Sequence, residues 1–297
     1  MKIIIIGSKG FIGSHCLKYF SSKGYDVLGC DVMDSNESNY ISLKSVLFNF
    51  NKLFSEQKFD YCINAAGSAN VSYSFEFPEK DFELNVSLVI NLLGAIKNHS
   101  SDCKFINFSS AAVYGNPDSL PISENAETKP LSPYGYHKML SEKLLHEYYR
   151  FFGLKTCSLR VFSAFGEGLK KQLFWDLYQK SKLSSSIKLF GTGQESRDFI
   201  YIRDLVNAVD LIMRNAKFEG ESFNIANGDE VTVKEAASEF LAGIGWNGKL
   251  EFSGEVKAGD PLNWCADIRK TGAIGYVQEF SFKEGIQNYC KWLKDIK

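Results

Sequence analysis

Short apolar runs alternate with segments of helical periodicity along the first half of the chain. The runs at 3–6, 27–30, 61–64, 105–108 and 156–161 are mostly apolar and predict strands that are buried on both faces. Between them, apolar residues recur at helical spacing over 11–22, 51–57, 84–98 and 133–152. This alternation predicts an α/β fold with a doubly wound parallel sheet.

The alternation ends near residue 165. Beyond it we expect helices over 169–182, 204–215, 233–243 and 282–294, a strand at 187–190, and a strand at 200–201 that joins the first sheet. We therefore expect a larger domain over residues 1–165, to which 195–215 return, and a smaller α/β lobe over 166–297.

A glycine-rich turn follows the first predicted strand. Gly7, Gly10 and Gly13 are spaced Gly-x-x-Gly-x-x-Gly, and Phe11 and Ile12 open the helix that follows. A tight turn with incidental glycines is the plainer interpretation. A diphosphate, however, needs backbone N–H donors at a helix N-terminus and no side chain in its way. The context of strand, turn and helix favours dinucleotide binding.

An acidic residue ends the second predicted strand. Asp31 stands eighteen residues beyond Gly13, where a carboxylate accepts hydrogen bonds from the adenosine ribose hydroxyls. It would repel a 2′-phosphate, so it favours NAD over NADP. Asp34 is a rival for this role, and a solvated strand end is the alternative.

Tyr134 and Lys138 form a Tyr-x-x-x-Lys pair on a predicted helix, which places both on one face. A phenol is a poor base at neutral pH, and a neighbouring ammonium favours its ionised form. Ser109 and Ser110 end the strand at 105–108. Their hydroxyls should lie at the carboxyl edge of the sheet, where open α/β sheets bind ligands. Local backbone capping is the alternative for these serines.

Composition narrows the functional classes. With 34 Lys and Arg against 35 Asp and Glu, the net charge of -1 gives no bulk electrostatic case for nucleic-acid or membrane binding. The opening apolar run is too short for a signal peptide or a membrane span. The seven cysteines are scattered and the four histidines add no ligand spacing, so we expect reduced thiols, a cytoplasmic protein and no metal site.

Together these motifs resemble an extended short-chain dehydrogenase/reductase of the nucleotide-sugar epimerase/dehydratase family, similar to UDP-glucose 4-epimerase. Further matches run along nearly the whole chain, among them Asn64-Ala65-Ala66-Gly67, Asn85, Arg197-Asp198-Phe199-Ile200 and Gly259-Asp260-Pro261. The resemblance implies a Rossmann-type domain with a smaller substrate-binding lobe. It also implies a tightly held NAD, a nucleoside-diphosphate sugar as substrate, and a homodimer that pairs through the helices at 84–98 and 133–152.

The resemblance also assigns roles to residues. Tyr134 would be the base, Lys138 would hold the nicotinamide ribose, and Ser110 would hydrogen-bond the reacting hydroxyl. Ala65, Ala66 and Gly67 join the glycine turn, Asp31, Tyr134 and Lys138 as cofactor-binding residues. The implied substrate-binding residues are Ser109, Ser110, Ser163, Gln172, Phe190, Arg197 and Asp260.

The sequence departs from the family at several of these places. Ser163 and Gln172 stand where relatives carry asparagine, and Lys257 stands where they carry an arginine that can bind phosphate through two hydrogen bonds. The segment between residues 31 and 60 lacks the usual strand end that touches adenine. Trp264 lies where relatives gate the sugar pocket, and its bulk argues against a 2-acetamido sugar.

The dehydratases of the family carry an Asp-Glu pair where this chain has Ala111 and Ala112. Two methyl groups cannot supply the acid and base that elimination of water needs. What remains is hydride chemistry at C4, and a retained cofactor with Asp31 as its ribose clamp favours a nucleotide-sugar 4-epimerase that works by transient oxidation there. The alternative is an NAD(P)-dependent 4-ketoreductase or C4 dehydrogenase of a nucleotide-linked deoxy or heptose sugar, and the remote alternative is a non-catalytic dinucleotide sensor.

Overall fold

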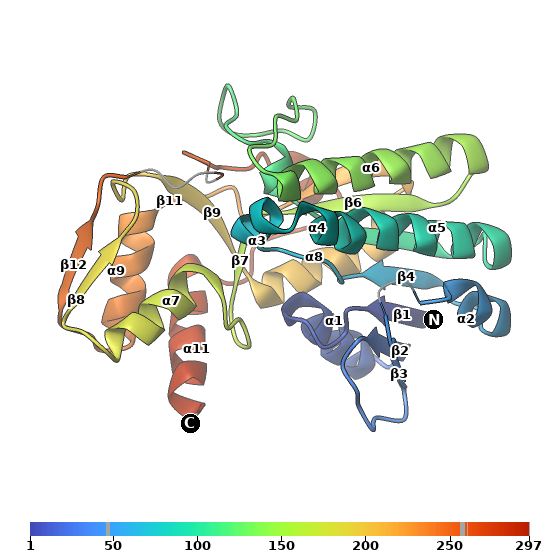
Figure 1. Ribbon diagram of the computed structural model, residues 1–297, viewed down its shortest axis with the longest axis horizontal. Helices are drawn as coiled ribbons and strands as arrows, with labels where there is room; N and C mark the ends of the chain where they lie inside the picture. Colours follow the sequence, from blue (N-terminus) through green and yellow to red (C-terminus); the bar gives the residue numbers. More distant parts are fainter. Residues whose placement is uncertain (46–47, 256–258, 260, 297) are drawn as a thin grey trace.

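A seven-stranded parallel sheet forms the centre of the larger lobe in the computed structural model, which describes residues 1–45, 48–255, 259 and 261–296 (Figure 1). The strand order is β10-β6-β5-β4-β1-β2-β3 and every neighbouring pair is parallel. The bounds are β1 (Lys2–Ile6), β2 (Asp26–Asp31), β3 (Tyr40–Ser42), β4 (Tyr61–Asn64), β5 (Lys104–Ser110), β6 (Thr156–Val161) and β10 (Glu219–Ile225). This confirms the predicted doubly wound parallel sheet.

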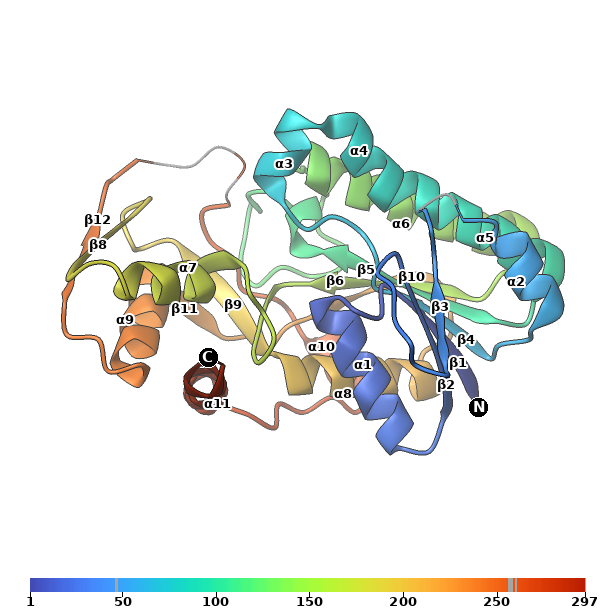
Figure 2. The same ribbon diagram turned by 60° about the horizontal axis from the view of Figure 1, so that its bottom comes forward.

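Helices cover both faces of this sheet (Figure 2). One face carries α2 (Phe50–Glu56), α3 (Val71–Glu76), α4 (Pro78–Phe82), a π-helical turn (Glu83–Ser87), α5 (Leu88–His99) and α6 (Pro133–Phe152). The other face carries α1 (Phe11–Ser22), α8 (Ile202–Asn215) and α10 (Arg269–Ala273). Alternate residues of β1 enter separate cores, because successive side chains of a strand point to opposite faces: Ile3 and Ile5 pack on the α1 side, and Ile4 and Ile6 on the α5 side.

Among the described residues, the smaller lobe holds two short sheets and three helices. Strands β7 (Ser163–Phe165), β9 (Ser196–Tyr201) and β11 (Glu230–Thr232) form one sheet, and β8 (Ser186–Leu189) pairs with β12 (Lys249–Phe252) in the other. The helices are α7 (Gln172–Ser181), α9 (Val233–Gly243) and α11 (Phe282–Asp295). One core cluster runs without a break from Ile3 and Ile5 into Phe174 and Tyr289, so the two lobes share their packing.

One expectation about strands is wrong. The strand expected at 200–201 belongs to the three-stranded sheet rather than to the first sheet, and β10 is the late segment that extends the large sheet. Strand β3, which pairs with β2, was not foreseen. The division into domains 1–165 and 166–297 stays a prediction. No helix among the described residues is long and apolar enough to cross a membrane.

The start of α6 fixes the orientation of the predicted catalytic pair. Ser132 caps the helix, its hydroxyl accepting a hydrogen bond from the Gly135 N–H at 3.1 Å, and Pro133 occupies the first helical position. The helix ends at a glycine in the left-handed conformation. Its buried face is largely polar, since Tyr134, Lys138 and Glu142 all face inward at a spacing of one turn.

Candidate active site

The glycine turn between β1 and α1 forms one wall of a cavity of about 210 Å³. Gly7 has φ +80, and a Cβ there would lie 2.5 Å from the Ala66 nitrogen, so only glycine fits. At Gly13 a Cβ would lie 2.1 Å from the Gly7 carbonyl oxygen, which explains how α1 approaches the turn so closely. The cavity is lined by Ile6, Gly7, Gly10, Asp31, Val32, Leu43, Ala65, Ala66, Gly67, Leu84 and Leu88.

Most of the predicted cofactor residues therefore meet in one place. Gly7, Gly10, Asp31, Ala65, Ala66 and Gly67 all line this cavity. Phe11 and Ile12 open α1 and pack against the core cluster on that side of the sheet. The apolar walls of the cavity had no counterpart among the predicted residues; one of them, Leu43, directly follows the unforeseen strand β3.

The cavity distinguishes the two candidate aspartates. Asp31 lines it, and its carboxylate accepts a hydrogen bond from the backbone N–H of Lys9 at 2.9 Å. Asp34 is instead bound by the Ser42 hydroxyl at 2.6 Å on the exposed side of the loop. The Lys9 ammonium pairs with the Glu37 carboxylate at 2.6 Å. Its positive charge is therefore shared with Glu37 and does not fully offset the negative charge of Asp31. A negative carboxylate at the cavity wall suits ribose hydroxyls and disfavours a 2′-phosphate.

Ser110, Tyr134 and Lys138 come together at the carboxyl end of β5. Ser110 is the last residue of that strand; its hydroxyl accepts from the Ala112 N–H at 3.1 Å and hydrogen-bonds Tyr134. The Lys138 ammonium lies 6.0 Å from the centre of the Tyr134 ring and donates to the Phe108 carbonyl oxygen at 2.8 Å.

Burial controls the ionisation of both groups. It raises the pKa of Tyr134 to about 12. The hydrogen bond with Ser110 acts in the opposite direction and lowers this pKa, whereas the charge of Asp81 raises it further. Burial also lowers the pKa of Lys138 to about 8, although the charges of Asp81 and Glu142 act in the opposite direction. A phenol that accepts a proton at neutral pH in this site needs added positive charge next to it.

The cavity and the catalytic group are joined through Gly67. A Cβ at Gly67 would lie 2.7 Å from Asn85 Oδ1 and 3.3 Å from Lys138 Nζ. Asn85 sits in the π-helical turn, and neither atom of its buried amide has a hydrogen-bond partner among the described residues. An amide left unpaired in this way is a ready partner for a polar ligand, because burial without a partner is costly. These residues fit NAD: Asp31 would hold its adenosine end, and Asn85, Tyr134 and Lys138 would lie at its nicotinamide end.

The predicted substrate residues are more dispersed. Ser109 does not face the site: its hydroxyl donates to Glu142, which is also bound by Arg160 at 2.7 Å. Arg197 donates to the carbonyl oxygens of Ser196 and Leu262 at 2.7 and 3.1 Å, and its guanidinium lies 5.6 Å from the Trp264 ring.

The remaining substrate predictions lie in or beside the smaller lobe. Phe190 is 63% exposed just after β8, and Ser163 opens β7. Gln172, the first residue of α7, has φ +64, a conformation that a side-chain-bearing residue rarely adopts. Asp260, like Lys257, lies outside the described residues.

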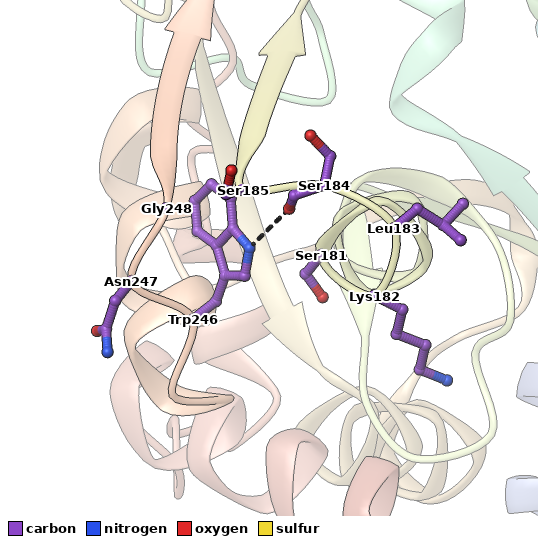
Figure 3. Close-up of a pocket in the computed structure, with 8 residues that line it drawn as sticks. All are labelled: Ser181, Lys182, Leu183, Ser184, Ser185, Trp246, Asn247 and Gly248. Carbon is purple, nitrogen blue, oxygen red and sulfur yellow. Dashed lines mark hydrogen bonds between the residues drawn. The ribbon is translucent and has the colours of Figure 1, made fainter.

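A larger hollow lies in the smaller lobe, between the end of α7 and the residues just before β12 (Figure 3). It has a volume of about 460 Å³ and is bordered by residues 181–185 and 246–248. Trp246 lines it and is held by a hydrogen bond from Nε1 to the Ser184 carbonyl oxygen at 3.1 Å. None of the predicted cofactor or catalytic residues borders this hollow.

Comparisons with known proteins agree with this geometry. A family model described as "NAD dependent epimerase/dehydratase family" matches residues 3–226. A protein described as a putative UDP-glucose 4-epimerase from Methanocaldococcus jannaschii is 30% identical over 307 residues, covering 99% of this chain and 98% of that one.

Two solved structures superpose over almost the whole chain. The UDP-glucuronic acid 4-epimerase of Bacillus cereus, in complex with UDP-glucuronic acid and NAD, is 26% identical with a TM-score of 0.89 and is matched over 100% of both chains. The UDP-glucose 4-epimerase of Thermotoga maritima, with UDP-glucose, is 26% identical with a TM-score of 0.90 over 99% of both chains.

Proposed function

The chain belongs to the NAD-dependent epimerase/dehydratase family, and from this premise we propose that it is a nucleotide-sugar 4-epimerase that keeps NAD bound during turnover. The observation that carries the proposal is the meeting of Ser110, Tyr134 and Lys138 beside a dinucleotide cavity, with Gly67 at the junction. A protein that only sensed a dinucleotide would have no use for this group.

The side chains of the site move and hold a proton. Tyr134, in its ionised form, takes the proton of the sugar C4 hydroxyl and later returns it. The Ser110 hydroxyl holds the sugar hydroxyl in place by a hydrogen bond. Lys138 steadies the phenolate by its charge. Bound NAD supplies reversible acceptance of a hydride at C4. Ala111 and Ala112 offer no acid or base, so the keto sugar stays intact, turns over in the site and is reduced again at its other face.

We propose Arg197, Ser163, Gln172, Phe190 and Asp260 as the substrate-binding residues. The support is the guanidinium of Arg197, whose geometry suits a diphosphate, and the exposed ring of Phe190, which suits a nucleobase. The relatives described above bear the names of UDP-glucose and UDP-glucuronic acid epimerases, so a UDP-linked sugar is the first substrate to test. Ser109 is not included, because its hydroxyl is taken by Glu142.

We also propose that two copies pair through α5 and α6. The support is a set of large apolar side chains that are exposed on this side of the sheet: Phe82, Ile90, Tyr136, Phe151 and Phe152. Helix faces of this kind are more often covered than left in water. A cytoplasmic location is proposed from the thiols, all seven of which are free.

The experiment that tests the proposed activity uses the purified protein with UDP-glucose and UDP-glucuronic acid, each followed by proton NMR at C4. An epimerase converts one C4 isomer into the other with bound NAD and no net change of absorbance at 340 nm. Stoichiometric oxidation of added NADH or NADPH would instead favour the ketoreductase. Absence of both from NAD-loaded protein, over a panel of nucleotide sugars, would contradict the proposal.

A further inference from the structure

A buried pair of ionisable residues lies next to the catalytic group, and the proposed mechanism does not use it. Asp81 of α4 is 0% exposed, and its Oδ2 lies 2.6 Å from Nδ1 of His137 on α6. Its other oxygen, Oδ1, has no hydrogen-bond partner among the described residues. His137 is also nearly buried, and the ring of Phe82 packs against it edge-on at 5.4 Å.

The pair is placed to act on both catalytic residues. His137 directly precedes Lys138 and lies one helical turn beyond Tyr134, so all three are held by the same stretch of α6. The Asp81 carboxylate acts on both residues through space: it favours the charged form of Lys138 and disfavours the charged form of Tyr134.

The other charged groups near this pair are already paired or face solvent. On α6, Glu142 is neutralised by Arg160 of β6 at 2.7 Å. On α4 and the π-helical turn, Lys80 pairs with Glu83 at the surface at 3.4 Å. Glu76 of α3 and Glu79 of α4 are exposed, where water screens them. Asp81 is thus the fully buried carboxylate of this region that lacks a cationic Lys or Arg partner within 4 Å in the described chain.

We propose that Asp81, held by His137, is a positioning residue whose buried negative charge keeps Lys138 protonated and sets the pH range in which the Tyr134–Lys138 couple works. The effect of Asp81 on the pH profile of catalysis rests on the proposed function. The electrostatic part concerns the protein alone, and it can be measured without a sugar substrate.

Removing the negative charge of Asp81 should move the titrations of Lys138 and Tyr134 in a known direction. Asp81→Asn keeps the shape and one acceptor oxygen for His137, but it removes the negative charge. Lys138 then loses its proton at lower pH, and the Tyr134 phenolate forms at lower pH. Both limbs of the pH profile of kcat should move to lower pH together. A loss of packing alone would lower kcat without moving the limbs.

The direct test follows the Lys138 ammonium by NMR of protein labelled with ¹³Cε-lysine. The Lys138 signal is identified by its absence in Lys138→Met. In Asp81→Asn the midpoint of this titration should fall to lower pH, because the negative charge that favours the protonated form of Lys138 is gone. The matched control is Asp204→Asn, which removes an equally buried carboxylate that does not act on Tyr134 or Lys138, and which should leave the midpoint in place.

A second variant separates charge from packing. His137→Gln keeps a hydrogen-bond donor and leaves the Asp81 charge, so the Lys138 midpoint should stay or rise. A fall equal to that of Asp81→Asn, or an unmoved midpoint in a folded Asp81→Asn protein, would overturn the proposal. If Asp81→Asn does not fold, the double variant Asp81→Asn/His137→Gln, in which two amides can pair, carries the same expectation. Because no turnover is needed, failure here is distinct from failure of the epimerase assay.

Discussion

Replacing Tyr134 with phenylalanine tests the proposed chemistry most directly. The ring is buried and stays packed, so the change removes one hydroxyl whose structural partner is Ser110. Loss of a positioned general base typically costs about 10²–10⁴-fold in rate. At 1.36 kcal/mol for each tenfold, that is about 3–5 kcal/mol of transition-state stabilisation. The same hydroxyl contributes only about 1 kcal/mol to the free energy of unfolding.

A second buried tyrosine provides the matched control. The Tyr114 hydroxyl donates to Asn224 Oδ1 at 2.7 Å and accepts from Arg160 at 2.8 Å, away from the Ser110 group. Tyr114→Phe leaves two buried polar partners short of a hydrogen bond, so its cost in stability should exceed that of Tyr134→Phe. Its kcat should stay near that of the wild type.

The assay is C4 epimerisation followed by NMR, together with urea unfolding of both variants and a measurement of bound NAD after purification. We expect Tyr134→Phe to be the slower of the two variants and Tyr114→Phe to be the less stable. If NAD-loaded Tyr134→Phe turned over within tenfold of the wild-type rate, Tyr134 could not be the base, and the assignment of roles in the site would be refuted.

Three further predictions concern the cofactor cavity and the buried charges. Gly7→Ala should abolish NAD binding measured by calorimetry, because its Cβ would collide with neighbouring backbone, whereas Gly24→Ala, at the same φ of +80 with open space around it, should cost only about 1 kcal/mol and keep NAD. Glu142→Gln should lower the free energy of unfolding by about 3–5 kcal/mol in urea titrations, because Arg160 is left as a buried charge; a loss below 1 kcal/mol would contradict this. Lys138→Met should stop turnover yet stabilise the fold at pH 7, since burial lowers the pKa of Lys138 to about 8 while the unfolded chain holds its proton to about 10.4. The wild type therefore gains stability as the pH rises from 8 towards 10, so the advantage of the variant should shrink there, and an advantage that grew would refute the sign.

The sequence predicted the elements that have strong local signals. Helices 11–22 and 133–152 have the predicted bounds, because a glycine turn opens the first, and a capping serine with a proline at the first helical position opens the second. Strand β3 has only three residues and follows a polar run, Ser35–Asn39, so it produced no comparable signal. The sheet to which 200–201 belong was wrong, since an apolar run shows that a strand is buried but not which strand lies beside it.

The site could be predicted where a sequence motif fixes the positions of its residues in the fold. Gly7, Gly10 and Asp31 lie on one cavity because a strand–turn–helix unit and its neighbouring strand end at one sheet edge. Ser109 was misjudged, although alternation along a strand already places it on the opposite face from Ser110. The pair of Asp81 and His137 gave no sequence signal, because 56 residues separate two positions that only the packing of α4 on α6 brings into contact.

The buried face of α6 shows why stability and activity compete in this site. A helix packed for stability would bury apolar side chains, yet this one buries Tyr134, Lys138 and Glu142. Burying a charge costs several kcal/mol unless a partner offsets it, and Glu142 has such a partner in Arg160. Lys138 has the Phe108 carbonyl oxygen and, in the described chain, no carboxylate within salt-bridge distance. The buried charge with the weakest compensation is therefore that of Lys138, the ammonium that the Tyr134 phenolate requires. A carboxylate closer to Lys138 would stabilise the fold, but it would also offset the positive charge that favours the phenolate.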